Sequence, residues 1–372
     1  GLNAYFAYTV CGIMGYSWQT ALLAVFIEGI IFIVLSLTKV RESIFNCIPL
    51  ELKRAVSVGI GLFIAFIGLQ NAGLAVDSAT LVSLVDFREN FPTSGICALL
   101  AIIGLMITAV LYIKKVKGSI LIGVFGTWIL GIICQLTGIY VPDGKSYFSL
   151  FPTFAMTDFS KLGETFGQCF NVDFSAVGIV NFIVVIFSFL FVDIFDTLGT
   201  LIGVATKAKM LDKDGKMPKM KEALLADAVG TVAGACTGTS TVTTFIESGS
   251  GVEAGGRTGL TALTTAVMFL LCMFIAPIAA LIPAPATSAA LIYVGILMLS
   301  GLKKVDWDDI LQVIPVALML IFMPITGSIG HGIGMALISY SVVAAFTGKA
   351  KEVSILTYVL SALFLAKFFI IV

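Results

Sequence analysis

Two aspartates lie in the middle of a long apolar segment, where ionisable side chains are costly. Asp193 and Asp196 interrupt the sequence NFIVVIFSFLFVDIFDTLGTLIGV, which runs from Asn181 to Val204. Residues three apart share one face of a helix, and an acid at the bilayer centre costs about 2.5–3.5 kcal/mol on insertion scales. Two acids on one face therefore need hydrogen-bond partners, protons or a polar substrate. The pattern favours a functional site over a structural pair.

A second polar concentration is the segment GTSTVTTFIESGSGVEAGGRTG, residues 238–259. Its TSTVTTF part alternates hydroxyl and apolar residues and is rich in β-branched residues, which suits a short strand. Non-helical backbone at membrane depth is tolerated only where protein or a cavity satisfies it. We expect a mid-membrane strand ending at Glu247, which would face a ligand. A half-helix would restart from Ser248 onward, with Ser248 or Ser250 as its N-cap. A solvent-exposed turn is the alternative, and the number of membrane crossings disfavours it.

The remaining charged residues in apolar surroundings are interpreted as structural. Glu28 and Asp227 each lie in an apolar segment without a polar companion of the Asp193 and Asp196 kind. Glu253 and Arg257 are four apart, so they can pair on one helix face.

Composition places these residues in a membrane protein. Hydrophobic residues make up 59% of the 372 residues and charged residues only 12%, against about a quarter charged in soluble domains. The formal net charge is zero, which argues against a nucleic-acid partner. Seven scattered cysteines and the single His331 suggest neither a metal site nor a catalytic triad, so we expect no cofactor and no enzyme.

Apolar stretches follow one another without a soluble domain, which predicts an all-α polytopic protein. A spanning helix needs about 20 mostly apolar residues, and the candidates are 19–38, 55–75, 95–113, 118–138, 178–205, 222–237, 259–282, 286–301, 309–324, 328–347 and 354–372. Loops 39–54, 114–117 and 206–221 are rich in lysine or arginine and alternate with loops that are not. The positive-inside rule therefore places these three loops in the cytoplasm. Residues 48–66 and 282–300 echo each other in hydropathy, which indicates an internal repeat.

Three motifs, GLNAYFAYTV, FVDIFDTLGTLIGV and TTFIESGSGVEAGGRTGLTA, resemble the uracil–xanthine permease superfamily, of the nucleobase–cation symporter 2 type. Within it they are most similar to the AzgA-like adenine/guanine/hypoxanthine branch. The resemblance implies inverted repeats of seven spans, a core domain that moves against a gate domain, and short mid-membrane strands in spans 3 and 10. It also implies that spans 1 and 2 are missing here. The implied parts are core 1–38, gate 39–138, extracellular loop 139–177, core 178–282, gate 283–347 and a C-terminal helix 348–372.

The resemblance also implies roles for individual residues. Glu247 would hold the base through its ring N–H groups. Residues 1–10 would form the strand and half-helix of span 3, and Asn3 in this segment would form a hydrogen bond to the base. Asp193 and Asp196 match the acidic pair of span 8, and one of them would carry the coupling proton. The other expected substrate contacts are Asp193, Thr244 and Ser248. An aromatic side chain, namely Tyr5, Phe6, Phe195 or Phe245, would stack on the ring of the base. Thr200 stands where uracil and xanthine relatives often have histidine.

We therefore expect a cell-membrane transporter that imports purine nucleobases by proton symport, with an elevator or rocking motion. The main alternative is an anion transporter of the same fold, of the sulfate or bicarbonate type. A channel is a second and weaker alternative. Buried acids disfavour an anion site, because such a site should show cations or bare helix N-termini. The expected partners are the purine and the lipid bilayer, and the resemblance allows for a homodimer.

Overall fold

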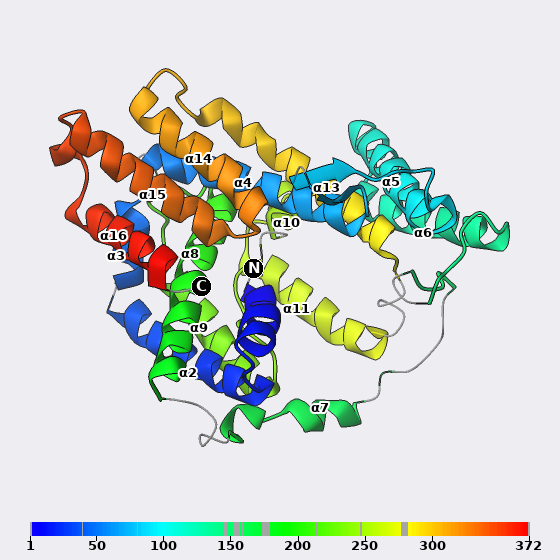
Figure 1. The fold of residues 1–372 in the computed structure, drawn as a ribbon, viewed down its shortest axis with the longest axis horizontal. Helices are drawn as coiled ribbons and strands as arrows, with labels where there is room; N and C mark the ends of the chain where they lie inside the picture. Colours follow the sequence, from blue (N-terminus) through cyan, green and yellow to red (C-terminus); the bar gives the residue numbers. More distant parts are fainter. Residues whose placement is uncertain are drawn as a thin grey trace. The chain divides into compact units, whose positions relative to one another are not determined.

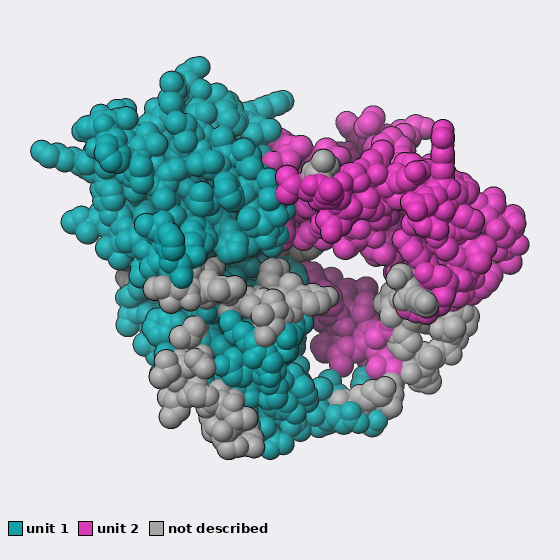
Figure 2. Space-filling view, viewed as in Figure 1, with its two compact units in different colours: residues 1–60, 159–256, 301–372 teal, residues 61–158, 257–300 magenta. Residues whose placement is uncertain are grey.

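The computed structural model describes residues 2–38, 40–79, 81–144, 147–151, 157, 159–172, 179–212, 215–245, 248–276 and 282–370 (Figure 1). The chain is mostly helical, and its contacts divide it into two compact units (Figure 2). Unit 1 comprises residues 1–60, 159–256 and 301–372, and unit 2 comprises residues 61–158 and 257–300. The division into core and gate domains stays a prediction.

The described part of unit 1 consists mainly of helices. Its elements are α1 (Leu2–Ala4), the π-helix η1 (Tyr5–Ile13), α2 (Trp18–Leu37), α3 (Val40–Cys47), the first half of α4 (Leu50–Asn71), α7 (Ser160–Thr165), η3 (Gln168–Phe170), α8 (Ile179–Lys207), α9 (Met220–Thr237), α10 (Ser248–Glu253), most of η5 (Leu299–Lys304), α14 (Ile310–Thr326), α15 (Ile329–Phe346), η6 (Ala350–Glu352) and α16 (Ile355–Ile370).

Helices α2, α8 and α9 form the part of unit 1 that positions the polar residues (Figure 1). Phe189 of α8 is fully buried in a cluster with Val25 of α2 and Ala235 of α9. At Gly29 of α2, an added Cβ atom would lie 2.7 Å from a methyl group of Val232 on α9. Small residues at such crossings let helix backbones approach closely in membranes. The close packing fixes the polar side chains of the three helices against one another.

The described part of unit 2 contains the second half of α4, a β-hairpin, the short π-helix η2 and four further α-helices. These are β1 (Ala75–Ser78), β2 (Leu81–Leu84), η2 (Phe91–Gly95), α5 (Ile96–Ile113), α6 (Ser119–Leu136), α11 (Gly259–Phe274) and α13 (Ala284–Met298). Strands β1 and β2 pair antiparallel, with Ala75 opposite Leu84 and Ser78 opposite Leu81.

The helices of unit 2 also pack through glycines. Thr108 of α5 lies against Gly123 of α6, and Thr127 of α6 lies against Gly104 of α5. Both threonine hydroxyls donate within their own helix at 2.8 Å, Thr108 to the Gly104 carbonyl and Thr127 to the Gly123 carbonyl. The reciprocal arrangement places polar hydroxyls inside the contact without leaving their donors unsatisfied.

The predicted polytopic architecture is confirmed by helix length and composition. Among the described residues, seven helices are long and apolar enough to cross a membrane: Trp18–Leu37, Leu50–Asn71, Phe91–Ile113, Ser119–Leu136, Val185–Thr206, Ala284–Lys303 and Ile329–Phe346. Three shorter apolar helices are Gly259–Phe274, Ile310–Thr326 and Ile355–Ala366.

The strand predicted within the first ten residues is wrong. Residues 2–13 are helical, as α1 and then η1. A helix satisfies its backbone N–H groups within the segment, whereas a strand at membrane depth needs a partner. The helical form also buries Leu2 and Val10 in the α2–α8 cluster. The pairing of strands seen in the described part of the chain is confined to the β1–β2 hairpin.

Candidate functional site

The second predicted strand falls on a non-helical stretch, residues 239–245, that runs back along α9. Helix α9 ends at Gly238, whose φ of +97° is left-handed, and a side chain there would meet Thr165 at 2.5 Å. Glycine is suited to this position because it adopts a positive φ without strain. The turn reverses the chain, so the stretch passes over the face of α9 that carries Gly230 and Gly234.

Side chains of α9, rather than a neighbouring strand, satisfy the backbone of this stretch. The Thr231 hydroxyl donates to the Val242 carbonyl at 2.8 Å, and the Thr244 N–H donates to Oδ1 of Asp227 at 3.1 Å. The Thr244 hydroxyl also donates to Oδ1 of Asp227, at 3.4 Å. The stretch is non-helical, as predicted, but no strand is formed in its described residues. Its extended backbone is tolerated because α9 supplies the hydrogen bonds.

Asp193 and Asp196 are both buried on α8, with 0% and 7% of their surface exposed. The Thr197 hydroxyl lies 2.8 Å from Oδ1 of Asp193 and 3.2 Å from Oδ2 of Asp227, so it links α8 to α9. Thr200 donates its hydroxyl to the Asp196 carbonyl at 2.9 Å, within α8. The structure therefore joins one acid of the predicted pair, Asp193, to the residue that holds the non-helical stretch.

Asp227 is the centre of this network, and the sequence interpretation of it as an isolated residue missed its partners. Its Oδ2 atom lies 3.2 Å from Nη2 of Arg41, and both side chains are at most 1% exposed. Arg41 also donates from Nη1 to the Leu224 carbonyl at 3.2 Å and lies 4.0 Å from the centroid of the Phe32 ring. In the sequence, Arg41 is one of the positive charges of loop 39–54. A buried acid in an apolar helix needs a counter-charge. This requirement is the sequence signal that Asp227 has a cationic partner.

Glu28 of α2 also has polar companions, which its isolated position in the sequence concealed. It is fully buried, and its Oε2 atom accepts a hydrogen bond from the Thr241 hydroxyl at 3.4 Å. Its carboxyl group also lies within hydrogen-bonding range of Asp193. Glu28 thus connects α2 both to α8 and to the non-helical stretch.

Of the other predicted site residues, Asn3 contacts the non-helical stretch, whereas Phe245 and Ser248 are exposed. Asn3 accepts a hydrogen bond at its Oδ1 atom from the Ser240 hydroxyl at 2.7 Å, so α1 reaches the same stretch. Phe245 is 62% exposed, and Ser248 is exposed at the start of α10. Tyr5 lies in η1, and only its backbone is described. Glu247 lies outside the described residues.

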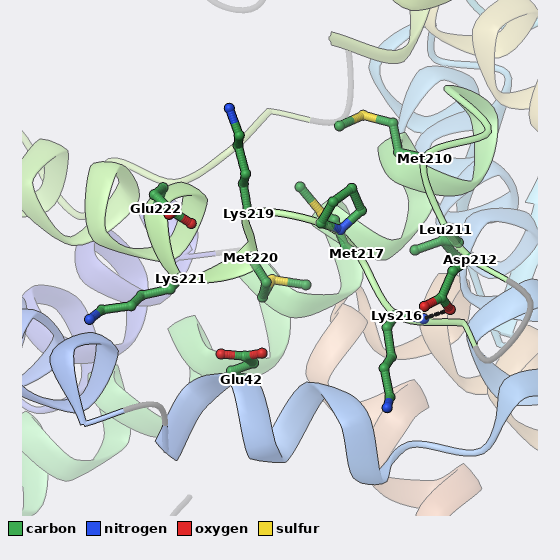
Figure 3. A pocket seen from close by; sticks show the side chains of 11 residues that line it. Glu42, Met210, Leu211, Asp212, Lys216, Met217, Lys219, Met220, Lys221 and Glu222 are labelled. Atoms are coloured by element: carbon green, nitrogen blue, oxygen red, sulfur yellow. Dashed lines mark hydrogen bonds between the residues drawn. The ribbon is translucent and has the colours of Figure 1, made fainter.

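A surface pocket of unit 1 does not coincide with this network. It has a volume of about 570 Å³ and is lined by Glu42 of α3, by residues 210–212 and 216–219 between α8 and α9, and by residues 220–222 at the start of α9 (Figure 3). Figure 3 shows Lys216, Lys219 and Lys221 extending in different directions. No buried acid of the network lines it, so it belongs to the connecting loop rather than to the candidate site.

Comparisons with known proteins agree with a membrane permease. The family model Xan_ur_permease, described as Permease family, matches residues 1–329. A putative permease of Methanocaldococcus jannaschii is 45% identical over 99% of this chain and 80% of its own length. The adenine permease AdeQ of Escherichia coli is 39% identical over 100% of this chain and 79% of its own. The guanine/hypoxanthine permease PbuG of Bacillus subtilis is 41% identical over 99% and 79%.

A solved structure shows the same fold at low identity. The transmembrane domain of the cyanobacterial bicarbonate transporter BicA aligns with a TM-score of 0.52 and 17% identity, over 90% of this chain and 79% of that domain. At this identity the likeness concerns the fold alone. The family match and the permeases named above show a multi-pass membrane permease rather than an enzyme. The chain therefore belongs to the Xan_ur_permease family of membrane permeases.

Proposed function

We propose that the protein imports purine nucleobases, namely adenine, guanine or hypoxanthine, by proton symport. Relatives at 39% and 41% identity are an adenine permease and a guanine/hypoxanthine permease, which supports this substrate class. The observation that carries the proposal is the buried polar network that ties Asp193, Asp227 and Thr244 together at the break between α9 and α10. It places carboxyl groups beside non-helical backbone inside a membrane protein.

The chemistry of a purine suits such a site. A purine presents N–H donors along one edge, and a carboxylate accepts them in charge-assisted hydrogen bonds. We assign this anchoring role to Glu247, which follows the stretch held by Asp227 and Thr231. The amide of Asn3 would serve a second edge of the base, and the hydroxyls of Thr244 and Ser248 would complete the polar contacts. The rings of Tyr5 and Phe245 would stack on the base.

Proton coupling would use Asp193 or Asp196. An acid held in an apolar interior is more easily accommodated when neutral, so protonation would lower the cost of moving the loaded site. The motion we propose is a rocking or elevator movement of the predicted core domain against the predicted gate domain. We also propose that the protein assembles as a homodimer.

Anion transport is the second candidate, and the fold shared with the bicarbonate transporter domain favours it. The charges disfavour it. In the described part of the network the cation is Arg41, and its guanidinium is already paired with Asp227. An anion entering here would meet carboxyl groups rather than unpaired positive charge.

Uptake in cells that lack their own purine transport tests the proposal. Radiolabelled hypoxanthine should accumulate and be competed by adenine or guanine, but not by sulfate or bicarbonate. Glu247→Gln should weaken the apparent affinity for the base, while the control Glu253→Gln, six residues away, should not. Unchanged affinity in Glu247→Gln would contradict the anchoring role. Competition by bicarbonate, without competition by purines, would contradict the substrate class.

A further inference from the structure

We propose that Glu28 of α2 and Asp193 of α8 hold one proton between their carboxyl groups and that this proton accompanies the substrate. The inference rests on the proposed function, and it adds Glu28, a residue first interpreted as structural. It also chooses Asp193 over Asp196 as the acid on α8 that takes part.

The hydrogen bonds of the two groups leave one oxygen of each without a donor. Oε2 of Glu28 accepts from Thr241, and Oδ1 of Asp193 accepts from Thr197. Neither Oε1 of Glu28 nor Oδ2 of Asp193 is reached by a donor in the described part of the chain, although both atoms are buried. Both residues are 0% exposed, so bulk water does not supply the missing donor. A buried polar atom without a partner requires a specific explanation.

A shared proton supplies that explanation. The two carboxyl groups lie within hydrogen-bonding range of each other. An ionised carboxyl group only accepts hydrogen bonds, whereas a protonated one has an O–H to donate. Two neighbouring carboxyl groups therefore form a hydrogen bond only when one of them is protonated. They repel each other when both are ionised. One proton satisfies both orphaned oxygens at once.

The charges around the pair do not remove the need for this proton. The positive charge of Arg41 attracts the carboxyl groups of both Glu28 and Asp193. However, its guanidinium is already paired with Asp227 at 3.2 Å. Besides Glu28, the acids whose negative charge repels an ionised Asp193 are Asp227 and Asp196. The Arg41–Asp227 pair is neutral as a unit, so Glu28 and Asp193 are left with acidic neighbours rather than with a free cation.

The position of the pair connects the proton to the substrate stretch. Thr241, which donates to Glu28, lies in the non-helical stretch that leads to Glu247. Loss of the proton would replace a hydrogen bond by repulsion between α2 and α8, and it would act on the stretch through Thr241. Protonation therefore favours one packing of α2, α8 and the stretch, and deprotonation favours another.

Glu28→Gln tests the proposal, because a glutamine N–H donates to Asp193 permanently and replaces the mobile proton. The parent, Glu28→Gln and the exposed control Glu222→Gln are reconstituted in vesicles that contain a pH indicator. Hypoxanthine added to the parent and to Glu222→Gln should carry protons inward. Glu28→Gln should lose proton movement and uphill accumulation, but should still exchange labelled for unlabelled hypoxanthine.

The outcomes separate the inference from the proposed function. No hypoxanthine movement in the parent would contradict the proposed function itself. Proton-coupled accumulation in both the parent and Glu28→Gln would leave the proposed function standing and overturn the inference. If Glu28→Gln does not fold, infrared spectroscopy of the parent at neutral pH decides. A protonated buried carboxyl should give its own C=O band, and absence of that band would overturn the shared proton.

Discussion

Replacing Gly234 by alanine should displace the non-helical stretch from α9. A Cβ atom at Gly234 would lie 2.5 Å from a methyl carbon of Val242 and 3.0 Å from one of Thr239. At Gly230, one helical turn earlier, the nearest atom would be a Val242 methyl carbon at 3.5 Å, an ordinary contact. The two positions face the same residue, so Gly230→Ala is a matched control for Gly234→Ala.

The expected free energies of unfolding follow from two opposing terms. Alanine is about 1 kcal/mol more favourable than glycine inside a helix, and overpacking costs about 1–3 kcal/mol. Gly230→Ala gains the first term alone and should be as stable as the parent or up to about 1 kcal/mol more stable. Gly234→Ala has the same gain from helix propensity but also the cost of overpacking, so its free energy of unfolding should be about 1–3 kcal/mol lower than that of Gly230→Ala.

Heating the detergent-solubilised variants, followed by size-exclusion chromatography, measures this difference as an apparent Tm. Gly234→Ala should melt below Gly230→Ala, and it should also take up hypoxanthine more slowly, because Thr244 and Glu247 follow the displaced residues. Equal melting of the two variants, together with equal uptake, would refute the packing of the stretch against α9.

Three further predictions concern other parts of the molecule. Arg41→Met or Asp227→Asn alone should lower the free energy of unfolding by about 3–5 kcal/mol, because a buried charge or its bonding partner is left unpaired. In a double-mutant cycle, the double variant should lose less stability than the sum of the two single variants. Additive losses would contradict the ion pair. Gly104→Ala should lower the apparent Tm through its clash with α6, whereas Gly126→Ala, which has no atom within 4 Å of the added carbon, should not; equal melting would contradict the α5–α6 packing. Burial raises the pKa of Tyr140 above its ordinary value, so the phenol ionises at a lower pH in the unfolded chain than in the folded one. The parent should therefore lose stability above about pH 10. Tyr140→Phe should lose less stability over that range when melting is measured at a series of pH values, and an identical pH profile for the two proteins would contradict this reasoning.

Hydropathy predicted the helices well, because each span is a local property of about 20 residues. The expected span 19–38 became Trp18–Leu37, and 328–347 became Ile329–Phe346. The first ten residues were mispredicted because aromatic and small residues there fit a helix as well as a strand. The β1–β2 hairpin is not predicted by hydropathy, because its two four-residue strands lie in the connection between two spans.

The polar network was only partly predictable, because its contacts join residues far apart in the chain. The spacing of Asp193 and Asp196 singled out one face of α8, and that face is indeed buried. Nothing in the spacing connects Arg41 with Asp227, which are 186 residues apart, or Glu28 with Thr241, which are 213 apart. These pairs arise from the packing of α2, α3 and α9, which hydropathy does not specify. The roles of all these residues in transport stay predictions.

Uptake by the purified protein in vesicles tests the central claim most directly. With an inward proton gradient imposed, radiolabelled hypoxanthine should accumulate above its external concentration, and an uncoupler should abolish the accumulation. Vesicles without protein provide the control for leakage. Accumulation of bicarbonate or sulfate in place of the base would contradict purine transport, and accumulation of the base that ignores both the gradient and the uncoupler would contradict proton symport.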